Sequence, residues 1–364
     1  MRIKAKRMSK NSKKTYLVIG GVVILMALVA TGVFAMRHLS NKPAVLSKEE
    51  RKNGEVPPDE IDDSKPVSGD EKDSNHRPFA VMINNISTAR PYQSGLQDAY
   101  IVYELIAEGG ITRFLALFKD METARIGTVR SARHYYLDYV LENDAYFVHW
   151  GWSPQAQSDI SSLKIDNING LHYSNKYFWT DTSLKVSTEH TRFTNMEKLE
   201  KAIKDLGYRT TSNKDMLLNY SEDSLDLEQI KNAKKCDTVN IKYSNSTTTN
   251  YKYDSEKKVY FRSVNNKAHV DYVSKEQYNF KNIIVYQVKN TSIDQDDKGR
   301  QELNNIGTGT GYYISEGYAI PIKWEKKSRS AETKYTLENG EELVVNEGNT
   351  FIQIQPKGLS LDIK

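Results

Sequence analysis

The chain has 364 residues with a formal net charge of +4, and it contains a single cysteine, Cys236. Nine of its 51 Lys and Arg lie in residues 1–42, which hold no Asp or Glu, so the remainder carries 42 basic against 47 acidic side chains, a charge of −5. An acidic remainder argues against a nucleic acid partner, because such partners are held mainly through their phosphates. One cysteine excludes an internal disulfide.

Residues 1–14 form a basic tail, and residues 15–36 follow without a single charge. An uncharged apolar run of that length is typical of a membrane-spanning helix. Because the basic cluster precedes it, the tail is predicted to stay in the cytoplasm and the rest to lie outside the cell membrane. An alternative is cleavage after Ala35, which would release the protein. Residues 37–75 are rich in charged residues, Pro and Ser, which predicts a disordered linker.

Residues 76–215 are predicted to form a mixed α/β domain. Short apolar runs at 79–83, 100–106, 111–118 and 145–150 indicate strands. Ser131 is a plausible N-cap for a helix reaching residue 142, and Ser153-Pro154 begins another helix. A polar helical stretch follows residue 199.

Residues 236–358 are predicted to form a mostly antiparallel β domain, so the fold class expected for the whole chain is α+β. Short alternating segments begin near residue 239 and end near residue 354, and turns such as Asn339-Gly340 separate them. The repeat Gly307-Thr308-Gly309-Thr310-Gly311 lacks the lysine and the following helix of a phosphate loop, so it is expected to be a turn.

The densest polar group inside an apolar run contains Glu104, Glu108 and Arg113. A spacing of four puts both carboxylates on one side of the segment. Such a pair can act as general acid and base, bind a cation, or form structural ion pairs. These possibilities stay open.

A second polar group contains Arg130, Ser131 and Arg133, with Asp138 beyond. Arginines beside free backbone N–H groups favour an anion such as a carboxylate or phosphate. The alternative is that they pair with Glu104, Glu108 or Asp138 and hold the domain together.

Other polar side chains are expected beside the same cleft. Ligands of open α/β sheets bind beyond the carboxyl ends of strands, where Asn84 and Trp150 are placed by the pattern. Tryptophan usually packs in a core, and stacking on a sugar is the alternative. The remaining candidates for ligand binding lie in loops, namely Arg90, Gln93, Ser94 and His190.

The sequence predicts no metal site and no cofactor. Residues 294–299 begin like a calcium loop, but Asn305 stands at the twelfth position, where a bidentate Glu is needed. No His or Cys spacing suits zinc.

Several motifs together resemble a known family. They are residues 77–85 (RPFAVMINN), 89–96 (ARPYQSGL), 102–114, 127–133, 149–154, 189–190 and 348–356. They resemble the YerB-like lipoproteins of Firmicutes, a family with an N-terminal and a C-terminal domain of unknown function, over roughly residues 78–356. The resemblance implies an envelope location. Many members are held by a lipidated cysteine, which is missing near the apolar segment here, so the helix 15–36 is expected to replace it.

The function expected is that of an extracytoplasmic envelope protein, anchored by residues 15–36, that binds a cell-wall glycan or peptide. If it also cleaves glycan, Glu108 would be the general acid, with Glu104 or Asp138 in support. The competing expectation is a non-catalytic adaptor or sensor that recruits an envelope protein.

Overall fold

The computed structural model describes residues 75–364, which belong to one compact unit. Within 75–364, no helix is both long and apolar enough to cross a bilayer. The predicted basic tail, membrane span and linker up to residue 74 lie outside the described residues, so their expected roles stay predictions.

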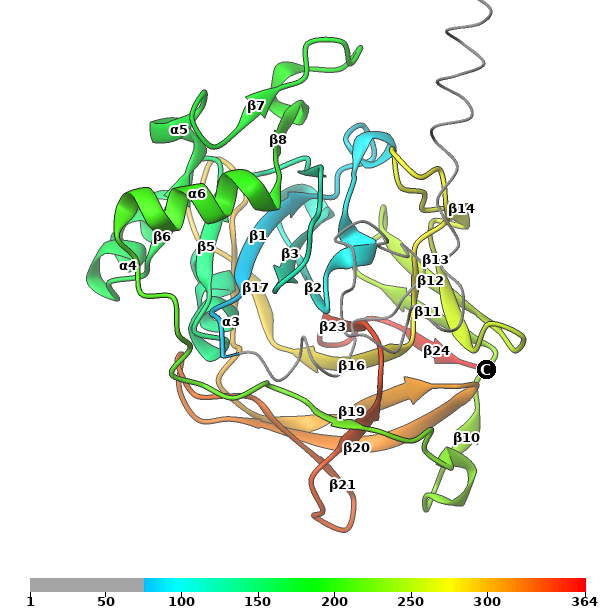
Figure 1. Cartoon of the computed structure of the whole chain (residues 1–364). Coiled ribbons are helices and arrows are strands. Elements are labelled where there is room, and N and C mark those ends of the chain that lie inside the picture. The colour runs from blue at the N-terminus through cyan, green and yellow to red at the C-terminus, as the bar shows by residue number, and fades with distance from the viewer. Residues whose placement is uncertain (1–74) are drawn as a thin grey trace, which may run out of the picture. The chain divides into compact units, whose positions relative to one another are not determined.

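The N-terminal half alternates strands and helices, as the sequence pattern predicts (Figure 1). Its strands are β1 Phe79–Asn84, β2 Ile101–Ile106, β3 Thr112–Phe118, β4 Ile126–Gly127, β5 Tyr146–His149, β6 Asn167–Asn169, β7 Trp179–Thr180, β8 Arg192–Thr194 and β9 Asn219–Ser221. Its α-helices are α3 Leu137–Glu142, α4 Pro154–Ser162, α5 Gly170–Tyr173 and α6 Met196–Leu206. The predicted cap of α4 is confirmed, because the Ser153 hydroxyl accepts a hydrogen bond from the Ala156 N–H.

The predicted helix start at Ser131 is wrong. Residues 131–133 are extended, a 3₁₀ turn covers His134–Tyr136, and α3 begins only at Leu137. The cause is pairing with the segment after β5: the Ala132 N–H donates to the Gly151 carbonyl, and the Ser153 N–H donates to the Ala132 carbonyl. These bonds hold the backbone in an extended form that a helix cannot adopt.

The C-terminal half is almost entirely strand. Its strands are β10 Lys234–Lys235, β11 Thr238–Lys242, β12 Thr248–Asp254, β13 Val259–Val264, β14 Lys267–Ala268, β15 Asn279–Phe280, β16 Asn282–Val288, β17 Asn290–Ser292, β18 Gln301–Leu303, β19 Gly307–Ser315, β20 Tyr318–Lys326, β21 Lys334–Leu337, β22 Val344–Asn346, β23 Thr350–Pro356 and β24 Leu361–Ile363. The expected turn at residues 307–311 is wrong, because this repeat is the first half of β19.

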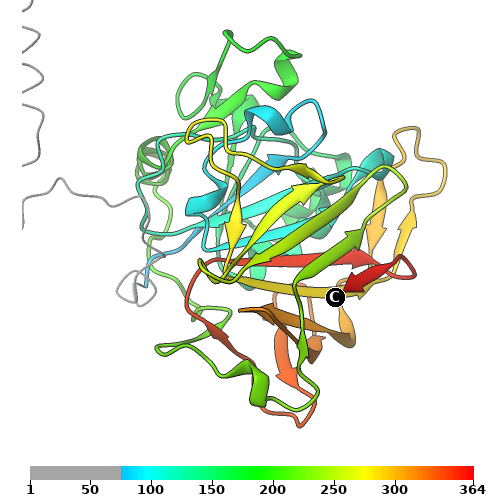
Figure 2. The same ribbon diagram turned by 90° about the vertical axis from the view of Figure 1, so that its right-hand side faces the viewer.

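One sheet crosses both halves, in the strand order β10-β20-β19-β16-β23-β2-β3-β1-β5-β6, with β21 beside β20. The junction is β23, which pairs in parallel with β2 of the N-terminal half and with β16 of the C-terminal half. A second sheet, β14-β13-β12-β11-β24, lies in front of the central sheet in Figure 2. The two halves therefore share a sheet.

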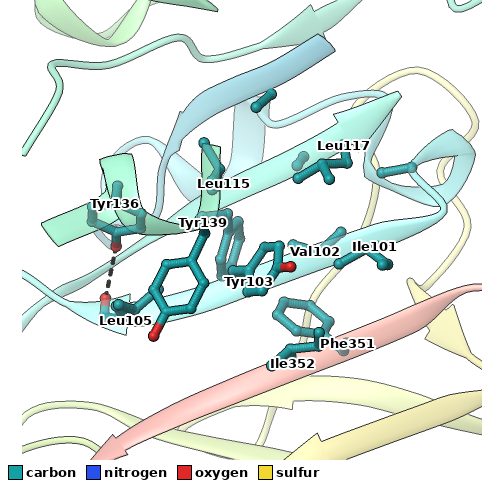
Figure 3. Close-up of a cluster of buried hydrophobic side chains, with 14 of the residues drawn as sticks. Ile101, Val102, Tyr103, Leu105, Leu115, Leu117, Tyr136, Tyr139, Phe351 and Ile352 are labelled. Carbon is teal, nitrogen blue, oxygen red and sulfur yellow. Dashed lines mark hydrogen bonds between the residues drawn. The ribbon is translucent and has the colours of Figure 1, made fainter. Parts of the chain in front are cut away.

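The core lies where β2, β3 and β23 meet α3 (Figure 3). The rings of Tyr103 and Tyr139 lie 4.8 Å apart. The Tyr136 hydroxyl donates to the Leu105 carbonyl at 3.0 Å. Buried tyrosines need such partners for their hydroxyls, so these contacts fix α3 against the sheet.

Candidate functional site

The candidate site lies at the carboxyl ends of β1 and β5. These strands are parallel neighbours, so their carboxyl ends share one edge of the sheet. The loop 127–133 crosses that edge: the Arg130 N–H donates to the Met82 carbonyl, and the Trp150 N–H donates to the Arg130 carbonyl. The fold therefore places Arg130 and Trp150 beside the carboxyl ends of these strands.

A pocket of about 380 Å³ opens at this edge, within the range of small-molecule sites. It is lined by Val129, Arg130, Ser131, Trp150, Gly151, Trp152, Leu171, Glu189 and Arg192. Two indole rings, two guanidinium groups and one carboxylate therefore meet at a single concave surface.

The Trp150 ring is held in a defined orientation. The Arg192 guanidinium lies over it at 4.4 Å, and the Phe178 ring meets it edge to face at 5.5 Å. A Cβ on Gly170 would lie 2.1 Å from an indole carbon of Trp150, so only glycine fits beside the ring. A ring fixed in this way loses little conformational entropy when a ligand stacks on it.

Arg130 forms an ion pair with the carboxylate of Glu189. Its Nη2 donates to Glu189 Oε2 at 2.6 Å, and its Nη1 donates to the Glu189 carbonyl at 3.2 Å. The Glu189 side chain is 52% exposed. The hydrogen bond from Arg130 lowers the pKa of Glu189. A ligand carboxylate could take the place of this exposed Glu189 on Arg130.

Glu108 belongs to an adjoining ion-pair cluster. It accepts from Arg113 Nη2 at 3.1 Å and from Arg133 Nε, and Arg113 Nη1 donates to the Ser131 carbonyl at 2.8 Å. Burial raises the pKa of Glu108, but Arg113 and Arg133 outweigh burial and hold that pKa below its ordinary value. Glu108 is therefore ionised at neutral pH, which is unfavourable for a general acid.

Glu104 points into a different cluster, which joins the two halves of the chain. It is fully buried and accepts from Arg262 Nη2 at 2.9 Å and from the Thr112 hydroxyl at 2.7 Å. Asn85 and Thr249 also donate to it. Every oxygen of Glu104 is engaged by side chains of the fold, so this carboxylate holds the halves together.

The loop candidates Arg90 and Gln93 belong to this same buried cluster. Arg90 donates to the Asn85 side chain and carbonyl, and Gln93 donates to the Asn84 carbonyl. Ser94 pairs with Gly127 through the backbone.

Asn84 and His190 link this cluster to the pocket. The Asn84 amide lies 2.9 Å from His190 Nδ1, and His190 follows the pocket residue Glu189. Burial lowers the pKa of His190. His190 is thus a neutral structural support at neutral pH.

Asp138 lies in a third cluster. Arg329 Nε donates to it at 2.6 Å, and the Asn305 amide donates at 3.0 Å. Burial raises its pKa against the opposing effect of Arg329. Glu104, Glu108 and Asp138 thus each have their own arginine partners in separate clusters.

The fold therefore brings Arg130, Ser131 and Trp150 into the pocket, with Arg113 and Arg133 beside it. Arg192 and Trp152 also line the pocket, and each lies two residues after a predicted site residue, His190 or Trp150. Arg262 and His269 carry no such signal, because their N-terminal partners, Glu104 and Gln93, are more than 150 residues away in sequence. Among residues 75–364, no group of three or more His, Cys, Asp or Glu side chains could hold a metal ion.

His269 should make the fold sensitive to acid. It is buried between Arg262 Nη1, which donates to its Nδ1 at 2.6 Å, and the Gln93 side chain. Burial, with Arg262 and Arg90, lowers its pKa well below the ordinary value. Below pH ~6.5 the His269 imidazole is protonated in the unfolded chain but stays neutral in the folded chain. The free energy of unfolding is therefore highest above that pH and decreases as the pH falls below it.

We expect the free energy of unfolding to fall by up to about 1.4 kcal/mol per pH unit below pH 6 through His269. Urea unfolding of wild type and His269→Gln at pH 7.5 and 5.5 measures this, since the variant lacks the titrating ring. Equal pH slopes in the two proteins would contradict it.

Comparison with known proteins gives consistent matches for both halves. Residues 66–209 match the family described as "Protein of unknown function (DUF3048) N-terminal domain", and residues 239–352 match its C-terminal domain. The chain therefore contains both domains of this class of protein, and the central sheet runs through both of them.

The chain belongs to the YerB family. It is 32% identical over 297 residues to the Bacillus subtilis (strain 168) protein named "Putative lipoprotein YerB", covering 80% of this chain and 86% of that protein. The crystal structure of YerB from Bacillus subtilis matches with a TM-score of 0.69 at 30% identity, covering 79% of this chain and 94% of that one. The resemblance seen in the motifs is confirmed.

Proposed function

We propose that this chain is an envelope protein, anchored through residues 15–36 outside the cell membrane, that binds a carboxylate-bearing cell-wall glycan in the Trp150 pocket. The relative's name as a lipoprotein supports an envelope location. We infer this class of ligand from one observation: two indole rings and the guanidinium groups of Arg130 and Arg192 line the same pocket.

Each part of the pocket suits one part of such a ligand. Indole faces stack on the apolar face of a sugar ring. A guanidinium group recognises a planar carboxylate through two parallel hydrogen bonds, and the lactyl group of muramic acid supplies such a carboxylate. A neutral sugar lacks that group, so the pocket should discriminate between the two.

Binding is favoured over cleavage by the state of the carboxylates. Glycan hydrolysis needs a protonated acid of raised pKa beside the glycosidic oxygen. Glu108 has a lowered pKa, and Glu104 is fully enclosed by its partners. Asp138 has a raised pKa, but it is bonded to Arg329 in a separate cluster and does not line the pocket. A Glu108→Gln variant should therefore bind purified wall as wild type does.

Two substitutions at one ion pair should have different effects on binding. Arg130→Gln removes the ligand's partner and should weaken binding roughly tenfold or more, the effect of losing a charged hydrogen bond. Glu189→Gln removes the internal competitor and should leave binding equal or tighter.

The measurement uses residues 64–364 and intrinsic tryptophan fluorescence, titrated with N-acetylmuramic acid and, as the matched ligand control, N-acetylglucosamine. Co-sedimentation with purified wall sacculi extends it to the polymer. If Arg130→Gln keeps wild-type affinity for N-acetylmuramic acid, the pocket is not the site. Retained binding of an envelope protein by this variant would then favour the adaptor role.

A further inference from the structure

A second groove lies at the opposite end of the central sheet from the Trp150 pocket. It has a volume of about 990 Å³ and lies against β16, β19 and β20, which are at the other end of the strand order from β5 and β6. In Figure 1 β19 and β20 lie below the N-terminal strands β1, β2 and β3.

The repeat in β19 gives this groove a polar floor. Gly309 and Gly311 face inward, where a Cβ on Gly309 would lie 2.6 Å from Trp324 Nε1 and one on Gly311 would meet the Val285 carbonyl. Only glycine fits there. Alternation along the strand then turns Thr308 and Thr310 to the other face, and both are exposed.

Three lysines surround these threonines. Lys323 stands directly opposite Thr310 in the β19–β20 pair, and Lys234 and Lys357 also line the groove. All three are exposed. Lys323 Nζ donates only to the Glu338 carbonyl, at 3.1 Å.

The lining of this groove has a net positive charge, although residues 43–364 as a whole are acidic. Glu338 is the single carboxylate among the described residues that line the groove, and its side chain accepts from the Asn232 amide. Glu325, opposite Thr308, is 3.9 Å from Lys327. Since residues 43–364 carry more acidic than basic side chains, a groove lined by three lysines and one glutamate is a local exception.

We infer that this groove binds a linear, phosphate-bearing polymer. Ammonium point charges with hydroxyl donors suit the tetrahedral oxygens of phosphate, whereas planar carboxylates are matched best by arginine, which is missing from the described lining. Side chains two residues apart on a strand repeat every ~7 Å, so Thr308, Thr310 and Tyr312 can meet successive units of a chain. This site is separate from the wall-glycan pocket and does not depend on it.

The test compares a triple variant of the groove with a matched control. Residues 64–364 carrying Lys234→Gln, Lys323→Gln and Lys357→Gln are titrated with inorganic polyphosphate by fluorescence anisotropy. The control carries Lys204→Gln, Lys252→Gln and Lys267→Gln, which remove the same charge from exposed positions elsewhere. Thr310→Val removes one hydroxyl at constant shape.

We expect the groove variant to lose at least tenfold in affinity and its slope of log K against log salt to fall by about 2, while the control keeps most of both. Thr310→Val should weaken binding, and Arg130→Gln should not. Equal losses in the two triple variants would overturn the inference. So would polyglutamate of equal charge binding as tightly, or single-stranded DNA binding while polyphosphate does not.

Discussion

Arg262→Met is expected to lower the free energy of unfolding by about 3–5 kcal/mol, the usual cost of breaking a buried ion pair. The Arg262 and Glu104 side chains are both 0% exposed. Removal of the guanidinium leaves the carboxylate buried with neutral donors alone, and it also removes the donor to His269. Because the pair joins β13 of the second sheet to β2 of the central sheet, the loss should weaken the packing of the two sheets against each other.

Urea unfolding followed by tryptophan fluorescence measures this effect. Lys201→Met is the matched control, since it breaks an exposed pair with Asp205 and should cost less than about 1 kcal/mol. The double variant Glu104→Met with Arg262→Met should be less destabilised than the sum of the two single variants, because neither charge is then left unpaired. Additive losses would show that the pair is not coupled.

Glu142→Gln is expected to have a loss of similar size, about 3–5 kcal/mol. Glu142 accepts from Lys326 Nζ at 2.6 Å, from the Tyr103 hydroxyl at 2.8 Å, and from the Thr333 hydroxyl at 2.7 Å. Lys326 is 1% exposed. The amide can neither balance the lysine charge nor accept from all of these donors.

The test is again urea unfolding, with Lys327→Met as the neighbouring control, since Lys327 is exposed and 3.9 Å from Glu325. The m-value should stay constant, which marks a change in stability and not in the denatured chain. A loss no larger than in the control would mean that α3 is held to β20 by packing alone.

Both predictions concern ion pairs at the seam, which is the contact between the N-terminal and C-terminal halves of the chain. The Trp150 pocket lies wholly in the N-terminal half, while the clusters around Glu104, Glu142 and Asp138 bind Arg262, Lys326 and Arg329 of the C-terminal half. A variant that weakens the seam should therefore reduce wall binding only as far as it unfolds the protein. Measuring stability and binding on the same variants separates a structural carboxylate from one that contacts ligand.

Local patterns predicted most of the elements. The apolar runs at 79–83, 111–118 and 145–150 became β1, β3 and β5, and Ser153-Pro154 begins α4. These succeed because a buried strand or a capped helix is specified by residues close together in the chain. The two errors, at Ser131 and at 307–311, arise where a distant partner decides: Gly151 holds residue 132 extended, and Trp324 requires glycine in β19.

The amino-acid sequence by itself determined the family, most of the strands and helices, and the selection of Arg130, Ser131 and Trp150, which the fold places in one pocket, since each depends on neighbours or motifs along the chain. Only the tertiary structure decided that Glu104 belongs to Arg262 and Glu108 to Arg113 and Arg133, although a spacing of four suggested one pair. The physical reason is that a buried carboxylate must find a cation wherever the fold places one, and here β23 brings the two halves together in one sheet.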